Sequence, residues 1–232
     1  MSTTTATELN APRGRSLEDR IRIAIWSVFA GLLVFYAVMA FEYFFALIGG
    51  RQEWWNLFQA WVVSDAFSFG DGSVYKEQHA SYSFNAYFLF VHTTLGAVAL
   101  AVGPFMFLRY IRRHYLNLHR TLGKVYLFSV WLSMTSGLLH LGTVSLWDVF
   151  SGAAFGVGLW GLDLLVILTS VMAYTAIRRK DVRTHQAWMA FNYALIVATP
   201  MLRVFWLMFG LATPGLTQST INAGVTTYLL PF

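Results

Sequence analysis

The sequence has 232 residues, of which 57% are hydrophobic and only 12% are charged, with a formal net charge of +5. Several apolar runs are longer than 20 residues, which excludes an ordinary soluble fold and predicts an all-α integral membrane bundle. There is no cysteine, so disulfides, iron–sulfur clusters and thiolate zinc sites are excluded. A metal would need histidine, methionine or carboxylate ligands.

Residues 1–16 are polar and are predicted to form a disordered cytoplasmic tail. Ser16 and Asp19 resemble a capping box that opens the first helix, which we expect to run to about Leu47. This apolar run is too long for the core of a signal peptide, and no small-residue cleavage site follows it. We therefore expect it to remain as a membrane anchor.

The connection formed by residues 49–84 is predicted to lie outside the membrane on the extracytoplasmic side. Between Gln52 and Phe67, tryptophan and phenylalanine alternate with polar residues, a pattern that favours an interfacial helix along the lipid headgroups. This helix would anchor or cover the mouth of the bundle. The alternative is a lid over a redox or ligand site.

Four further spans are predicted at residues 85–108, 121–143, 152–177 and 186–211, and prolines at 104 and 200 are expected to kink two of them. Together with the first helix they form a five-span domain over residues 17–211. Residues 212–232 form a short C-terminal segment, expected to lie outside or half-inserted, because its apolar part is too short to span.

The basic residues indicate the orientation. Of the 16 Lys and Arg residues, 13 lie before or at the start of the first span, or in and around the connections of spans two to three and four to five. The positive-inside rule makes this side the cytoplasm, which predicts a multi-pass protein of the cell membrane with a cytoplasmic N-terminus. The positive charge is thus a topology signal, and the expected partner is the lipid bilayer, not nucleic acid.

Polar residues inside the spans fall into two tiers, and such residues usually face the interior of a bundle. The inner tier contains His119 and His185, each in the first turn of its helix. The outer tier contains His92, His140, Glu42, Arg203 and, somewhat deeper, Asp163. His119 and His140 are 21 residues apart, roughly 30 Å along a helix, so one span presents an imidazole near each membrane surface.

The inner pair, His119 and His185, lies beside the positive ends of two helix dipoles, which favours neutral imidazole, the form that ligates metals. Two such groups on facing helices fit the axial ligation of haem b. The alternative is that both histidines cap helices or contact lipid phosphates.

The outer pair, His92 and His140, belongs to consecutive antiparallel spans. Three interpretations remain open: a second haem with Arg203 neutralising a propionate, a copper or zinc site that includes Glu42, or a structural network such as Asp163 with Arg203. His79 and His114 lie in polar connections and are assigned no role.

An ordered set of short motifs resembles a family of bacterial predicted membrane proteins of unknown function, DUF2306, whose signatures are G-P, H-R-x-x-G-R-x-Y and H-R-x-W-M-x-R. Gln186 and Phe191 replace arginines of that pattern. The resemblance covers about residues 85–211 and rests on His92, Gly103-Pro104-Phe105, His119-Arg120, Gly123-Lys124-Val125-Tyr126, Trp160, Asp181, His185, Trp188-Met189 and Arg203.

More loosely, a four-helix core with histidines at both membrane faces is similar to the di-haem cytochrome b proteins, although the fourth span here has no histidine. This resemblance implies transmembrane electron transfer from a quinol or cytoplasmic donor to an acceptor outside. The alternative is a non-redox protein, either a small transporter or an accessory subunit, whose buried His, Glu and Arg residues form a proton or metal path.

Overall fold

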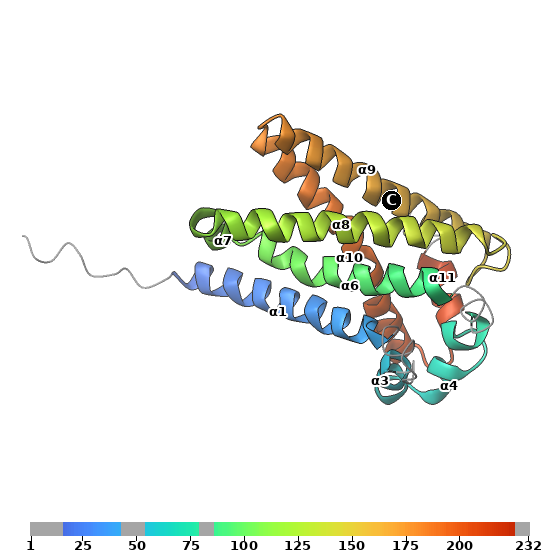
Figure 1. Cartoon of the computed structure of the whole chain (residues 1–232). Coiled ribbons are helices and arrows are strands. Elements are labelled where there is room, and N and C mark those ends of the chain that lie inside the picture. The colour runs from blue at the N-terminus through green and yellow to red at the C-terminus, as the bar shows by residue number, and fades with distance from the viewer. Residues whose placement is uncertain (1–15, 43–53, 79–85, 226–232) are drawn as a thin grey trace, which may run out of the picture. The chain divides into compact units, whose positions relative to one another are not determined.

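The computed structural model describes residues 16–42, 54–78 and 86–225, and these residues form helices and connecting segments (Figure 1). Five helices are long and apolar enough to cross a membrane: α1 (Leu17–Ala40), α6 (Ala86–Met106), α8 (Leu116–Gly142), α9 (Ala153–Arg178) and α10 (Val182–Ala212). The predicted all-α membrane bundle with five spans is confirmed. The expected ends of spans two and four agree with α6 and α9 to within two residues.

The chain divides into two units inside α1, with residues 1–32 in the first and 33–232 in the second. Within the first unit, the Asp19 backbone N–H donates to Ser16 Oγ (3.1 Å) and Ser16 Oγ donates to the Asp19 carboxylate (2.9 Å). The predicted helix start is therefore confirmed. Of the tail predicted for residues 1–16, residues 1–15 fall outside the described residues, as does the helix end expected near Leu47.

Within the second unit, α8 packs extensively against α6 and also against α9, while α10 packs against α9 and more lightly against α6. Two features mark the ends of this bundle. One end, called the basic end here, contains the short helix α7 (Arg109–His114) and the turn between α9 and α10. The opposite end, the cap end, contains α3 (Trp54–Val62), α4 (Asp65–Phe69) and α11 (Gln218–Gly224).

A buried polar layer joins three helices between the two ends. Tyr126 of α8 donates from its hydroxyl to Asn192 Oδ1 of α10 (2.7 Å). The Asn192 amide in turn donates to the Val166 carbonyl of α9 (2.7 Å) and to Thr169 Oγ1 (2.8 Å), and Thr169 donates to its own helix at Leu165 O (2.7 Å). Tyr126 and Asn192 are almost fully buried, so these bonds satisfy groups that would otherwise be costly inside a bilayer.

Tyr193 ties α10 to α6 at the same level. Its hydroxyl donates to the Leu100 carbonyl (2.8 Å), and its ring lies over Gly103 so closely that a Cβ on Gly103 would be only 1.9 Å from Cε2. The ring also neighbours Phe107 (5.5 Å between centroids). A residue without a side chain is therefore required at position 103, one residue before Pro104. Tyr126, Thr169, Asn192 and Tyr193 are called the middle layer below.

The connection between α1 and α6 differs from the single interfacial helix that was predicted. Its described part is broken into several short helical stretches, α3, α4 and residues 74–78, and Ser64 separates the first two because it caps α4 by accepting from the Phe67 N–H (3.1 Å). Trp55 and Phe58 of α3 pack edge-on against Tyr36 and Phe35 of α1, respectively. Trp61, in contrast, is 83% exposed, as expected for an aromatic anchor in the headgroup region.

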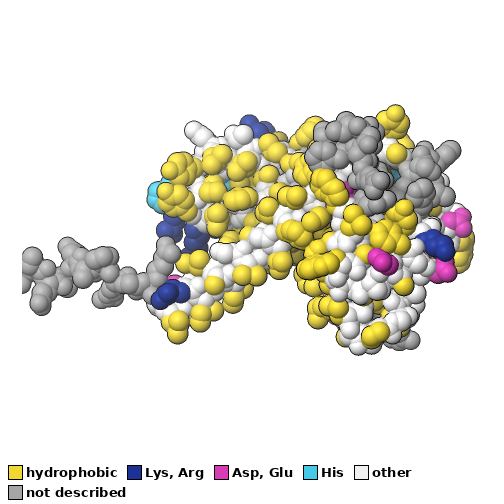
Figure 2. Space-filling model, turned by 90° about the horizontal axis from the view of Figure 1, so that it is seen from below, with side chains coloured by type: hydrophobic (Ala, Val, Ile, Leu, Met, Phe, Trp, Pro, Cys, Tyr) yellow, Lys and Arg dark blue, Asp and Glu magenta, His cyan; other side chains and the backbone are white. Residues whose placement is uncertain are grey.

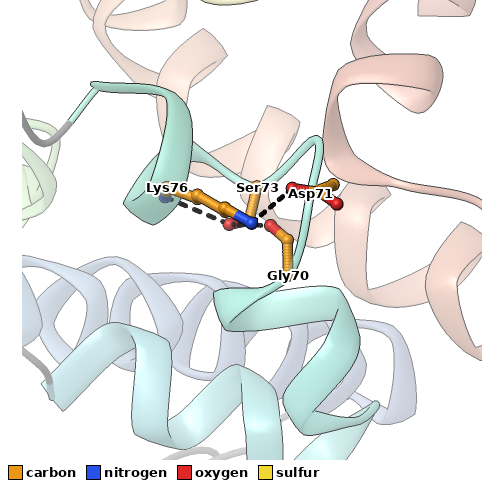
Figure 3. A network of polar contacts seen from close by, with 4 residues as sticks. All are labelled: Gly70, Asp71, Ser73 and Lys76. Carbon is orange, nitrogen blue, oxygen red and sulfur yellow. Dashed lines mark hydrogen bonds and ion pairs between the residues drawn. The ribbon is translucent and has the colours of Figure 1, made fainter.

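The segment that follows α4 is held by local polar contacts (Figure 3). Ser73 Oγ donates to the Gly70 carbonyl (2.7 Å) and accepts from the Lys76 backbone N–H (3.2 Å), while the Lys76 ammonium pairs with Asp71. The hydrogen bond and the charge of Lys76 lower the pKa of the Asp71 carboxyl from its ordinary value. This turn thus has a fixed shape on the surface of the cap end.

The C-terminal helix α11 completes the cap end. Gln218 accepts from the Val74 N–H (3.1 Å) and donates to the Phe67 carbonyl (3.0 Å), so α11 is joined to segments more than 140 residues earlier. Phe67, Phe150, Trp206 and Ile221 form a shared apolar core. The expectation that residues 212–232 lie outside or half-inserted stays a prediction, and residues 226–232 fall outside the described residues.

Candidate functional site

The four histidines of the two predicted tiers interact electrostatically within each tier. His119 and His185 are close enough for an electrostatic interaction between their rings, and the same is true of His92 and His140. The inner pair lies on α8 and α10 near the basic end, and the outer pair lies on α6 and α8 near the cap end. The fold therefore brings two imidazoles together at each level.

In the inner pair, a hydrogen bond fixes the tautomer of His185. Its Nδ1 lies 2.9 Å from the Ala173 carbonyl of α9, and a carbonyl can only accept, so Nδ1 carries the proton. This leaves Nε2 with the lone pair. Metal-ligating histidines usually have this arrangement, in which the second ring nitrogen donates to a backbone carbonyl.

The other inner histidine has no such anchor. His119 Nδ1 is buried and makes no hydrogen bond within the part of the chain that the structure describes. An unsatisfied ring nitrogen inside a bundle is costly unless a ligand or proton partner completes it. The inner pair thus combines one imidazole that is oriented by a hydrogen bond with one whose Nδ1 has no hydrogen-bond partner among the described residues.

The start of α10 is fixed by a side-chain cap. The Asp181 carboxylate accepts from the Thr184 N–H (3.1 Å), and hydrogen bonds from Thr184 lower the pKa of the Asp181 carboxyl from its ordinary value. His185 follows in the first turn, where its backbone N–H donates to the Asp181 carbonyl (3.1 Å). The cap therefore fixes the first turn of α10, and with it the backbone position of His185.

The outer pair repeats the inner arrangement. His92 Nδ1 donates to the Ser133 carbonyl of α8 (3.0 Å), and Ser133 Oγ donates back to the His92 carbonyl (2.6 Å). His140 Nδ1, like His119 Nδ1, is buried without a hydrogen-bond partner among the described residues. Each level therefore contains one imidazole with a free, oriented Nε2 and one with an unsatisfied Nδ1.

A glycine provides the space that the outer pair needs. A Cβ on Gly137 would lie 2.6 Å from His92 Nδ1 and 2.6 Å from Asp163 Oδ2, so the imidazole and the carboxylate both occupy the space left by the missing side chain. Asp163 is buried, with an exposed fraction of 7%. The sequence did not reveal Gly137, Ser133 or the Ala173 carbonyl, since nothing in their spacing distinguishes them from ordinary helix residues.

Arg203 and Glu42 have partners other than those expected. The Arg203 guanidinium stacks over Trp206 at 3.9 Å from the ring centroid, and Trp206 is itself fixed by a hydrogen bond to Asn222 (2.8 Å). No carboxylate of the described residues forms an ion pair with Arg203, so the network of Asp163 with Arg203, one of the three open interpretations, is not supported. Asp163 instead interacts with His92.

Glu42 accepts a hydrogen bond from the Trp55 backbone N–H (3.1 Å) and so connects the end of α1 to α3. In the described ranges, no three His, Asp or Glu side chains form a group that could hold a metal ion. The interpretation of a copper or zinc site built from the outer pair and Glu42 is therefore not supported.

Two imidazoles at one level fit a different kind of centre. Haem b takes four nitrogens from its porphyrin and only the two axial ones from the protein. His92 and His185, with Nδ1 bonded to a backbone carbonyl, and His119 and His140, with Nδ1 unpaired among the described residues, are the side chains that would supply those two nitrogens.

Comparison with known proteins gives one match. The sequence profile of the family described as predicted membrane protein (DUF2306) matches residues 89–229, a region that includes all four paired histidines and Arg203. No curated protein and no solved structure matches the chain. Since the matched region is more than half of the sequence, the chain belongs to the DUF2306 family of predicted membrane proteins.

Proposed function

We propose that the protein binds b-type haem between its histidine pairs and transfers electrons across the membrane. The observation that carries this proposal is the repeated arrangement of two imidazoles at each level, one with its Nδ1–H anchored to a backbone carbonyl and one with a buried, unsatisfied nitrogen. Bound haem would supply one-electron chemistry. The protein's part is to fix the axial nitrogens.

In this proposal His119 and His185 are the inner axial ligands, and His92 and His140 are the outer ones. Arg203 is half-buried in α10, close in depth to His140, and has no carboxylate partner in the described chain. A guanidinium at that depth is costly without an anion. A propionate of the outer haem would provide one, while the stacking on Trp206 would hold the guanidinium in place.

The middle layer supports electron transfer over a transport path. Its hydrogen bonds run from Tyr126 through Asn192 to the carbonyls of Val166 and, through Thr169, Leu165, which are terminal acceptors. A proton entering this chain has no onward donor, and the rings of Tyr126 and Tyr193 lie 6.4 Å apart with little exposure. An electron can tunnel through such a layer, whereas an ion would need an opening.

A second candidate is a non-redox transporter or accessory subunit with a buried proton site. The observation in its favour is the buried Asp163 carboxylate beside His92. Stable protein that stays colourless when supplied with haem would favour this candidate.

The five apolar helices make the protein a multi-pass membrane protein. We further propose that it resides in the cell membrane with the N-terminus and the basic end in the cytoplasm, because the basic residues concentrate there. The electron would then enter from a quinol or cytoplasmic donor and leave towards an acceptor outside.

Ligand removal tests the proposed function. His119→Ala or His185→Ala is expected to abolish the inner haem and leave the outer one, because one remaining axial imidazole holds the iron poorly. His92→Ala or His140→Ala should have the opposite effect. Haem content per chain and the reduced-minus-oxidised spectrum of each purified variant measure this directly.

The matched control is His114→Ala. His114 is exposed on α7 and its ring donates only to the Tyr110 carbonyl (3.1 Å), so haem content should not change. Equal haem content in all five variants would show that the paired histidines are not ligands.

A further inference from the structure

The two ends of the second unit carry opposite charge. The basic end holds nine cationic side chains, and eight of them are exposed. Asp181 is the acidic residue of the described chain in the same turns, and it is engaged as the cap of α10. None of the nine forms an ion pair with a described carboxylate. They are Arg109, Arg112, Arg113, Arg120, Lys124, Arg178, Arg179, Lys180 and Arg183.

The cap end has the reverse composition. Asp65, Asp71, Glu77 and Asp148 are exposed there, and the one exposed cation among its described residues, Lys76, is paired with Asp71. In Figure 2 most of the magenta side chains lie at the right of the view. The ends therefore present fields of opposite sign to their surroundings.

The inner histidine pair lies within the cationic end. His119 is adjacent to Arg120 in α8 and interacts electrostatically with Arg112 of α7, and both His119 and His185 are only half-buried. A small molecule at this surface can thus come close to the inner pair. The outer pair, in contrast, lies at the level where Asp163 is buried beside His92.

We infer that the basic end docks an anionic electron donor and directs it to the inner histidine pair. This inference rests on the proposed function, and it names the charge class of the donor. The donor would lose one electron, and haem iron held by His119 and His185 would accept it, while the part of this chain is to hold the anion beside that pair. No bond is made or broken in this step. A surface with several unpaired cations raises the local concentration and association rate of an anion and does the reverse for a cation.

The first measurement uses binding alone and does not need haem. Hexacyanochromate(III), a paramagnetic and redox-inert anion, is added to the protein in uncharged detergent, and the histidine ring signals are followed by NMR. The signals of His119 and His185 should broaden before those of His92 and His140. Arg112→Gln combined with Arg113→Gln should weaken this broadening, whereas Lys76→Gln, at the cap end, should not.

The second measurement follows haem reduction by stopped flow. Reduction by the anionic iron(II)–EDTA complex should slow at least a few-fold in the Arg112→Gln/Arg113→Gln variant and at high salt, while reduction by the cationic hexaammineruthenium(II) should not slow in that variant. The haem content of the same sample reports on the proposed function separately.

Two results of the binding measurement would overturn the inference. One is broadening that is equal at both histidine pairs or unaffected by the loss of Arg112 and Arg113. The other is broadening that disappears when phosphatidylglycerol is added to the micelles, because the basic end would then be a surface for anionic lipid. Haem-loaded protein whose two reduction rates respond equally to the arginine variant would overturn it as well.

Discussion

Gly103→Ala is expected to prevent stable folding, because the new Cβ would lie 1.9 Å from Cε2 and 2.5 Å from Cζ of Tyr193. The ring is buried and its hydroxyl donates to the Leu100 carbonyl, so it cannot move without breaking that bond and disturbing the adjacent Asn192. Overpacking costs roughly 1–3 kcal/mol, and an unsatisfied buried carbonyl adds about 1–3 kcal/mol. The thermal midpoint in detergent should fall strongly.

The control is Gly158→Ala in α9, where a Cβ would have nothing within 4 Å and alanine favours the helix. A double-mutant cycle makes the test specific. In a Tyr193→Ala background the clash is absent, so adding Gly103→Ala should cost little. If Gly103→Ala destabilises the protein equally with and without the Tyr193 ring, the proposed packing is wrong.

Gly137→Ala is expected to destroy the outer site and preserve the inner one. The Cβ would lie 2.6 Å from both His92 Nδ1 and Asp163 Oδ2, and the imidazole would have to turn away from the Ser133 carbonyl. An axial ligand displaced in this way no longer binds iron along the required direction. Haem content should fall by about half, and the remaining spectrum should be that of the inner centre alone.

Gly161→Ala, a substitution in open space on α9, is the matched control for this variant. Pairing Gly137→Ala with Asp163→Ala removes one of the two clashes and leaves the one with His92. The double variant should therefore still lack the outer haem. Full haem content in Gly137→Ala would mean that His92 is not a ligand.

The sequence predicted the spans because each contains a run of apolar residues long enough for a bilayer, but hydropathy misplaced two of the starts. We expected spans at 121 and 186, whereas α8 begins at Leu116 and α10 at Val182. The additional first turns contain His, Arg and Thr, which are polar yet remain helical where they pass through the headgroup region. Hydropathy detects the hydrocarbon core, while the helix itself continues beyond it.

The pairing of histidines followed from their depth along each helix, which residue numbers determine well. The hydrogen-bond partners of the histidines could not be predicted from the sequence, because the Ser133 and Ala173 carbonyls are backbone groups that any residue type would present. The contact of Arg203 with Trp206 was also not predicted from the sequence. Burial of a cation predicts that it has a partner, but only the helix rotation decides that the partner is the Trp206 ring and not a carboxylate.

The central claim is that the paired histidines hold haem, and one spectrum tests it most directly. The wild-type protein is purified from haem-replete cells, its folding is verified by a cooperative thermal transition, and its reduced-minus-oxidised absorption spectrum is recorded. Our account predicts the sharp alpha band of six-coordinate haem b, with haem content near two per chain if both pairs are filled. Folded protein that shows no such band after haem has been supplied would contradict the account.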